Sequence, residues 1–213
     1  MIGLLLKLKH RLPFVWRGIE VSNSVLFGLM HSRQITASAR RCLETNMLDG
    51  FRFCLLDDGH SHDVSEFLSR QPEKRTEFFK PHSFDLQTVS RLARDPAFLM
   101  FGAFRDDALV GYFFLRCFWN KKCFVGRFID QDWEGRGIGR VMNDILYNTA
   151  WNTGFRCMTT ISRHNHAVIR SHANNPSSHV LGDLPNDYML VELVRPGSGK
   201  SGTAPVQDRV GAD

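Results

Sequence analysis

The sequence predicts a layered α/β (α+β) domain in which helices flank a mixed, mainly antiparallel sheet. Three apolar runs of strand length follow one another with short polar turns between them: residues 97–104, 109–118 and 123–129. Three glycines at alternate positions separate the last run from a helical pattern: Gly135, Gly137 and Gly139. Another apolar run, residues 155–161, follows that helix. Such a crossover makes the strands on either side of it parallel, so the sheet is mixed.

Composition fits one domain with appendages. The chain has 213 residues, of which 43% are hydrophobic and 23% charged, and its 17 phenylalanines supply a large apolar area. The net charge of +5 suits an anionic ligand, but the basic residues are spread along the chain, so we expect no nucleic-acid partner. Five cysteines without a Cys-x-x-Cys pair predict reduced thiols, and hence a cytoplasmic protein.

Residues 1–50 form an N-terminal extension that we expect to be helical. Leucines recur at helical spacing before Pro13, with basic residues between them, and Pro13 is expected to end this first helix. The helix would pack on its own domain or make a weak contact with a membrane surface through residues 1–12. A second helix is expected over residues 38–48. No apolar run reaches the length of a transmembrane helix.

The main domain is expected over residues 51–195. Residues 51–56 read as a strand, Asp63 and Glu66 as a capping box, and Asp85 as the cap of another helix. After the crossover we expect one more helix and two strands, at residues 165–173, 179–182 and 188–194. The Gly-, Ser- and Pro-rich residues 196–213 read as a disordered tail.

The glycine stretch is suited to hold a phosphate. Glycine allows positive φ and close backbone approach, and free N–H groups at a helix start attract an anion. Arg136 and Arg140 could add charge-assisted contacts. The spacing is Gly-x-Gly-x-Gly, which fits neither the dinucleotide-binding fingerprint nor the P-loop.

Residues 129–139 resemble the pyrophosphate loop of GNAT-superfamily acyl-CoA N-acyltransferases. That family has a strand, a short polar-aromatic link, and then [Arg/Gln]-x-x-Gly-x-[Gly/Ala] opening a helix. Glu134 stands here at the Arg/Gln position. The resemblance implies a transferase that uses acetyl-CoA, with the backbone of Phe128 and Ile129 binding the pantetheine arm. It also implies that seven successive residues hold the pyrophosphate: Glu134, Gly135, Arg136, Gly137, Ile138, Gly139 and Arg140.

A second segment, residues 165–172, is similar to the family's Asn-x-x-[Ala/Ser]-[Ile/Leu]-x-x-[Tyr/His] pattern. The resemblance puts Asn165 near the coenzyme arm, and His172 where a tyrosine usually faces the thiol. Acyl transfer to an amine needs a proton acceptor for the amine and a donor for the departing thiolate. We therefore expect His172 to be the general acid. The candidates for the base are Asp130, His82 and His164.

The acceptor is expected to be a small-molecule amine. Residues 78–84 and 184–192 look similar to GNAT-like proteins associated with bacterial surface sugar synthesis, which favours an amino sugar or a nucleotide-linked sugar. A protein amine or another small amine is the alternative. A non-catalytic acyl-CoA-binding or interaction module also stays open, because the usual tyrosine and Gly-Phe are missing. No metal is expected, since His60 and His62 lack a third ligand. A homodimer stays open.

Overall fold

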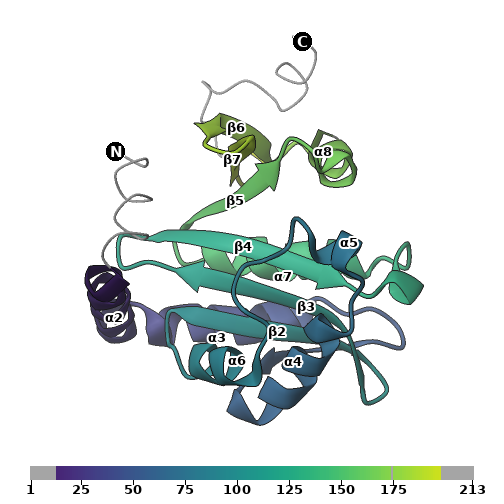
Figure 1. Cartoon of the computed structure of the whole chain (residues 1–213), viewed down its shortest axis with the longest axis horizontal. Helices are drawn as coiled ribbons and strands as arrows, with labels where there is room; N and C mark the ends of the chain where they lie inside the picture. Colours follow the sequence, from purple (N-terminus) through teal and green to yellow (C-terminus); the bar gives the residue numbers. More distant parts are fainter. Residues whose placement is uncertain (1–12, 174, 198–213) are drawn as a thin grey trace.

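The structure, a computed structural model, describes residues 13–173 and 175–197. These residues form one seven-stranded sheet in the order β1-β2-β3-β4-β5-β7-β6, with helices on both faces (Figure 1). The prediction of a mixed, mainly antiparallel sheet flanked by helices is confirmed. The predicted helix over residues 1–12 and most of the predicted tail lie outside the described residues.

Four strands form the first of two antiparallel parts of the sheet: β1 Arg52–Leu56, β2 Phe98–Arg105, β3 Ala108–Cys117 and β4 Lys122–Ile129. The β2–β3 and β3–β4 turns are tight. Asp106 and Lys121 have positive φ angles of 53° and 57°, which close the β2–β3 and β3–β4 connections. The meander predicted before the glycine stretch is therefore confirmed.

The glycine stretch leads into α7 (Ile138–Trp151), and the chain returns through β5 (Arg156–Ser162) parallel to β4. This confirms the predicted crossover. Gly154, with φ +74°, lies in the turn between α7 and β5. Two further strands extend the sheet beyond β5, both in antiparallel pairs: β7 Tyr188–Leu193 and β6 Ser178–Leu184.

Alternating side chains of the sheet fill two cores. On one face Phe101 and Phe113 pack with apolar residues of α7 such as Ile145. On the other face Met100 and Phe114 pack beneath α4 (Ser61–Ser69) and α6 (Leu86–Ala93). Since successive residues of a strand point to opposite faces, the nearly continuous apolar runs of β2 and β3 supply both layers.

The two helices before the sheet differ from the prediction. The described residues start inside a helical stretch, α2 (Pro13–Met30), for which no separate helix was expected, while the helix expected to end at Pro13 lies outside them. The next helix, α3 (Ser32–Thr45), starts earlier than expected. Phe27 and Ile35 are fully buried in the core on the α7 face. These helices thus share a core with the sheet.

The predicted capping box is wrong by one helical turn or more. Asp57 and His60 form the box, at a short 3-10 helix η1 (Asp58–His60), and Asp63 lies inside the first turn of α4. The cap at Asp85 is confirmed, because its side chain accepts a hydrogen bond from the Thr88 N–H at 2.8 Å. The remaining short elements are α5 Glu73–Thr76, η2 Gln131–Trp133 and α8 His166–Ala173. None of the described helices is long and apolar enough to cross a bilayer.

Candidate active site

The glycine stretch forms an open turn ahead of α7. Gly135 and Gly137 have φ angles of +74° and +86°, a region that side chains rarely adopt, and Gly137 is the N-cap of α7. A Cβ added at Gly135 would meet nothing within 4 Å. The backbone is therefore accessible from outside, and the first N–H groups of α7 have no partner within the helix.

A cavity of about 980 Å³, which we call the loop cavity, lies against this turn. Its walls are the glycine stretch, the first turns of α7, the end of α8 and the residues that follow α8. Arg140 adds a positive charge to the wall. Exposed N–H groups, the positive end of a helix dipole and an arginine together favour an anion here.

Two residues of the stretch line neither cavity. Ile138 is 1% exposed and belongs to the core. The guanidinium of Arg136 lies 4.7 Å from the ring centroid of Trp133 and donates to the Asp132 carbonyl at 3.2 Å. Arg136 therefore points to the polar-aromatic link before the glycines, and its expected contact with a phosphate stays a prediction.

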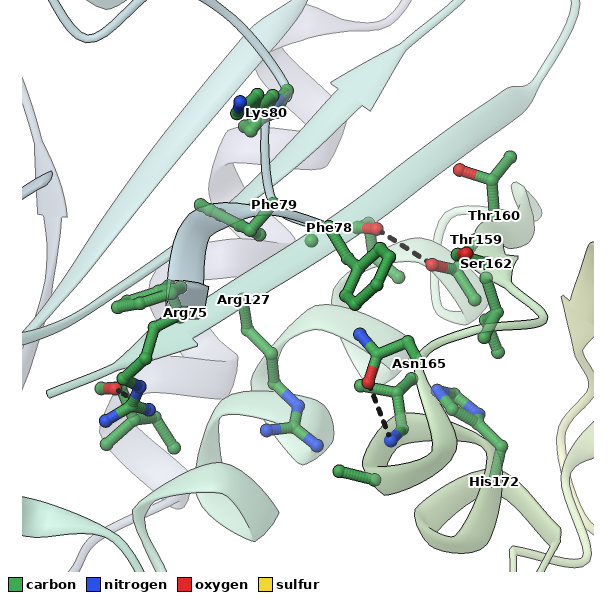
Figure 2. Close-up of a pocket in the computed structure, with 18 of the residues that line it drawn as sticks. Arg75, Phe78, Phe79, Lys80, Arg127, Thr159, Thr160, Ser162, Asn165 and His172 are labelled. Atoms are coloured by element: carbon green, nitrogen blue, oxygen red, sulfur yellow. Dashed lines mark hydrogen bonds between the residues drawn. The ribbon is translucent and has the colours of Figure 1, made fainter. Parts of the chain in front are cut away.

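β4 and β5 pair only over their first residues. Lys122, Cys123 and Phe124 lie opposite Arg156, Cys157 and Met158, and the pairing stops there. A second cavity of about 760 Å³, the splay cavity, opens between the later halves of the two strands. The Thr159 hydroxyl donates to the Val125 carbonyl at 3.3 Å at the point of separation. α5, residues 77–81 and α8 complete its walls (Figure 2).

The register of β4 decides which backbone groups face the splay cavity. The Asp130 N–H bonds to the Val110 carbonyl at 2.9 Å, so Phe128, two residues earlier, also turns its backbone toward β3. Arg127 and Ile129 then turn theirs toward the splay cavity. Phe128 was expected to bind a pantetheine arm through its backbone, and the register gives that position to Arg127 instead.

Arg127 was not predicted, yet it lines both cavities. Its Nε donates to Asn143 Oδ1 at 2.8 Å, and a Cβ at Gly139 would lie 2.9 Å from its Nη1. The guanidinium therefore sits against the first turn of α7, where the two cavities meet. The one sequence signal for Arg127 as a site residue was its position within an apolar strand, because a buried charge usually has a partner.

His172 also lines both cavities. Its Nδ1 lies 2.9 Å from Ser178 Oγ. Burial, and to a smaller extent the charge of Arg127, lowers the pKa of His172 to about 4. The imidazole is then neutral near pH 7, the form in which it has a free nitrogen lone pair.

Asn165 lies beside His172 in the splay cavity, as Figure 2 shows. Its Oδ1 accepts a hydrogen bond from the Val168 N–H at 3.2 Å and so caps the start of α8. The splay cavity thus brings Asn165 and His172 together with Ile129, and their expected roles toward the coenzyme stay predictions.

The three candidate bases lie elsewhere. Asp130 accepts from Gln71 Nε2 at 3.1 Å and lies 3.5 Å from Arg70 Nη2, so it ties β4 to the end of α4. His82 has Nε2 2.9 Å from the Tyr112 hydroxyl, and burial lowers its pKa. His164 is exposed, 3.4 Å from Asp187. None of the three lines the loop cavity or the splay cavity, because each is directed toward another part of the protein.

A comparison with protein-family models identifies the family of this chain. A model of the acetyltransferase (GNAT) family matches residues 62–174, which is more than half of the chain and includes β4, the glycine stretch, α7 and α8. The chain belongs to the GNAT acetyltransferase family. It is accordingly an acyltransferase, and acetyl-CoA is its cosubstrate. A comparison with curated protein sequences gave no significant match.

Solved structures of GNAT acetyltransferases share the fold. The PaiA N-acetyltransferase of Thermoplasma acidophilum, in complex with coenzyme A, is 14% identical, with a TM-score of 0.57 over 68% of this chain and 99% of that one. The ribosomal-protein-S5-alanine acetyltransferase of Vibrio fischeri is 13% identical, with a TM-score of 0.55 over 71% and 96%. AAC(6')-Ib, in complex with paromomycin and acetyl-CoA, is 15% identical, with a TM-score of 0.54 over 78% and 99%.

Glu134 marks where this acetyltransferase departs from the family's loop. Its carboxylate lines both cavities and forms an ion pair with Arg75 of α5. Arg75 also donates to the Ile129 carbonyl at 3.1 Å. Sequence reasoning missed Arg75, which lies outside both motifs. Among the described residues, no group of three or more His, Cys, Asp or Glu is placed to hold a metal ion.

Proposed function

We propose that this acetyltransferase binds acetyl-CoA across the two cavities and transfers the acetyl group directly to the amine of a small anionic acceptor. An amino sugar or a nucleotide-linked sugar is the acceptor class that we favour. The observation that carries the proposal is the separation of β4 from β5 next to the glycine turn. Arg127, Ile129 and His172 line both cavities, so one long ligand can lie in both.

The loop cavity suits the diphosphate of acetyl-CoA. Gly135, Gly137 and Gly139 would offer their backbone, with Arg140 beside them. The pantetheine arm, which carries amides, would pair with the splay-facing backbone of β4 as an added strand does. Arg127 and Ile129 supply those backbone groups.

Acetyl transfer then requires that the amine lies next to the acetyl carbon and that the amine proton reaches the departing thiolate. The neutral amine nitrogen forms a bond to the acetyl carbon, and the carbon–sulfur bond breaks with its electron pair on sulfur. A backbone N–H of β4 that faces the cavity stabilises the oxyanion. His172, neutral at pH 7, accepts the amine proton and returns it to the thiolate.

The far wall of the splay cavity supports an anionic acceptor with a flat or sugar-like body. Phe78 and Phe79 are half-buried there, and Lys74 and Lys80 add two positive charges. Tyr188 also lines this cavity. Aromatic faces bind sugars and bases, and lysines bind phosphate or carboxylate as point charges.

Thiol release tests the proposal. Acetyl-CoA would be supplied with matched amines: a nucleotide-linked amino sugar, the same free amino sugar, a polyamine and a peptide with a free N-terminus. We expect the nucleotide-linked sugar to have the highest kcat/KM. Lys80→Ala should lower that value, while Arg40→Gln, which removes an exposed charge from α3, should leave it unchanged. A preference for the polyamine or the peptide would contradict the acceptor class.

A further inference from the structure

Arg75 is held in an unusual position at the end of β4. One of its terminal nitrogens, Nη2, donates to the Ile129 carbonyl at 3.1 Å and pairs with Glu134. The guanidinium carbon lies 5.4 Å from the ring centroid of Phe128. The side chain is 21% exposed, so two hydrogen-bond acceptors and a ring fix a largely buried cation.

The other terminal nitrogen, Nη1, is buried and has no hydrogen-bond partner among the described residues. An unpaired buried N–H group of a charged side chain is costly, and native proteins seldom leave one without a purpose. Arg75 lines the splay cavity, and Figure 2 shows its side chain reaching from α5 to the β4 carbonyl. A ligand oxygen in the cavity would satisfy this donor.

Glu134 places a negative charge beside Arg75. A carboxylate that lines both cavities opposes any anionic ligand that passes between them. The ion pair with Arg75 cancels that charge. It also orients the guanidinium, because an arginine binds a carboxylate oxygen in a defined direction.

We propose that Arg75 is a binding residue for acetyl-CoA: Nη1 donates a hydrogen bond to an oxygen of the diphosphate–pantetheine portion, and Glu134 positions the guanidinium for it. The inference rests on the proposed function. The loop has no side-chain donor at Glu134. Arg75 of α5, about sixty positions before the glycine turn, would supply that donor instead.

Coenzyme A binding by calorimetry tests the donor. Arg75→Ala should weaken binding roughly 10- to 100-fold, the effect of losing a hydrogen bond to a charged group. Arg70→Ala is the matched control, since Arg70 pairs with Asp130 in the same region but lines neither cavity. It should stay within about twofold of wild type. Equal affinity of Arg75→Ala and wild type would overturn the inference.

The double variant separates binding from simple charge cancellation. If Arg75 only neutralised Glu134, then Arg75→Ala with Glu134→Gln would bind coenzyme A like wild type, and the inference would be overturned. We expect the double variant to stay roughly 10-fold weaker than Glu134→Gln alone, because the donor is still missing. Should Arg75→Ala not fold, Arg75→Lys keeps the charge but not the second donor. It should also lose roughly 10-fold, and wild-type affinity would overturn the inference.

Two ligands distinguish the source of the oxygen. Equal loss with coenzyme A and with pantetheine, which has no phosphate, indicates a pantetheine amide oxygen. Loss with coenzyme A alone indicates the diphosphate, and either result supports the inference. Failure of the wild-type protein to bind coenzyme A would overturn the proposed function together with this inference. Binding that is indifferent to residue 75 would overturn this inference alone.

Discussion

The Nδ1 atom of His172 lies 2.9 Å from the Oγ of Ser178, so the end of α8 is tied to the start of β6 at the cavity wall. The imidazole is half-buried there, and its burial and, to a smaller extent, the charge of Arg127 lower the pKa of His172 to about 4.

We predict that His172 makes stability fall in weak acid. The folded protein keeps His172 neutral down to its pKa of about 4, whereas the unfolded chain binds a proton at its ordinary pKa of about 6.5. The contribution is complete above that ordinary pKa and is lost as the pH falls through the folded one. Between about pH 7.5 and pH 5 the free energy of unfolding should drop by about 2 kcal/mol through this group.

Urea unfolding of wild type and of His172→Gln at both pH values measures this drop. The variant cannot protonate at residue 172, so its loss of stability should be smaller by that amount. Parallel losses in the two proteins would show that the pKa of His172 is not lowered.

Arg127 should tune His172 and bind the cosubstrate. Arg127→Gln removes the positive charge that contributes to the lowered pKa, so the pKa of His172 should rise. It should stay below the ordinary value because burial is the larger cause. Two-dimensional NMR of the histidine ring protons follows the titration. Coenzyme A binding should weaken roughly 10-fold as well, and an unchanged affinity would remove Arg127 from the binding site.

Charge in the glycine turn should abolish cosubstrate binding. Gly137→Asp brings a carboxylate to the N-cap of α7, against the expected diphosphate, and should weaken coenzyme A roughly 100-fold or more. Gly139→Asp should do the same, with an added clash at Arg127. Gly137→Asn is the matched control, because asparagine has the same size, tolerates positive φ and is uncharged. Equal binding by the Asp and Asn variants would exclude an anion at this turn.

Helix α2 should prove essential to the fold. Phe27 is fully buried and its ring lies 6.0 Å from that of Phe155, which follows α7. Phe27→Ala should therefore lower the free energy of unfolding by about 3–5 kcal/mol. Leu29 lies on the same helix and is 82% exposed, so Leu29→Ala should change stability by less than about 0.5 kcal/mol. Similar melting temperatures for the two variants would mean that α2 is dispensable.

Most of the fold could be predicted from local sequence patterns. Apolar runs with polar turns predicted the meander, and the strand–glycine–helix–strand order predicted that β4 and β5 are parallel. The cap at Asp85 was predictable for the same reason, since its hydrogen bond joins residues three apart. The boundaries of α2 and α3 were not predictable, because their apolar residues pack mainly against the sheet and α7 rather than against one another.

The sequence by itself determined the glycine turn, the crossover around it, and the nearness of Asn165 and His172 to Ile129, because each depends on residues within one supersecondary unit. Only the tertiary structure decided which charged groups of the site meet and which protonation state His172 has. Arg75 meets Glu134 from 59 residues away, Asp130 turns to Gln71, and burial makes His172 neutral. Electrostatics act through space between groups that the fold brings together, so the order of residues along the chain does not specify them.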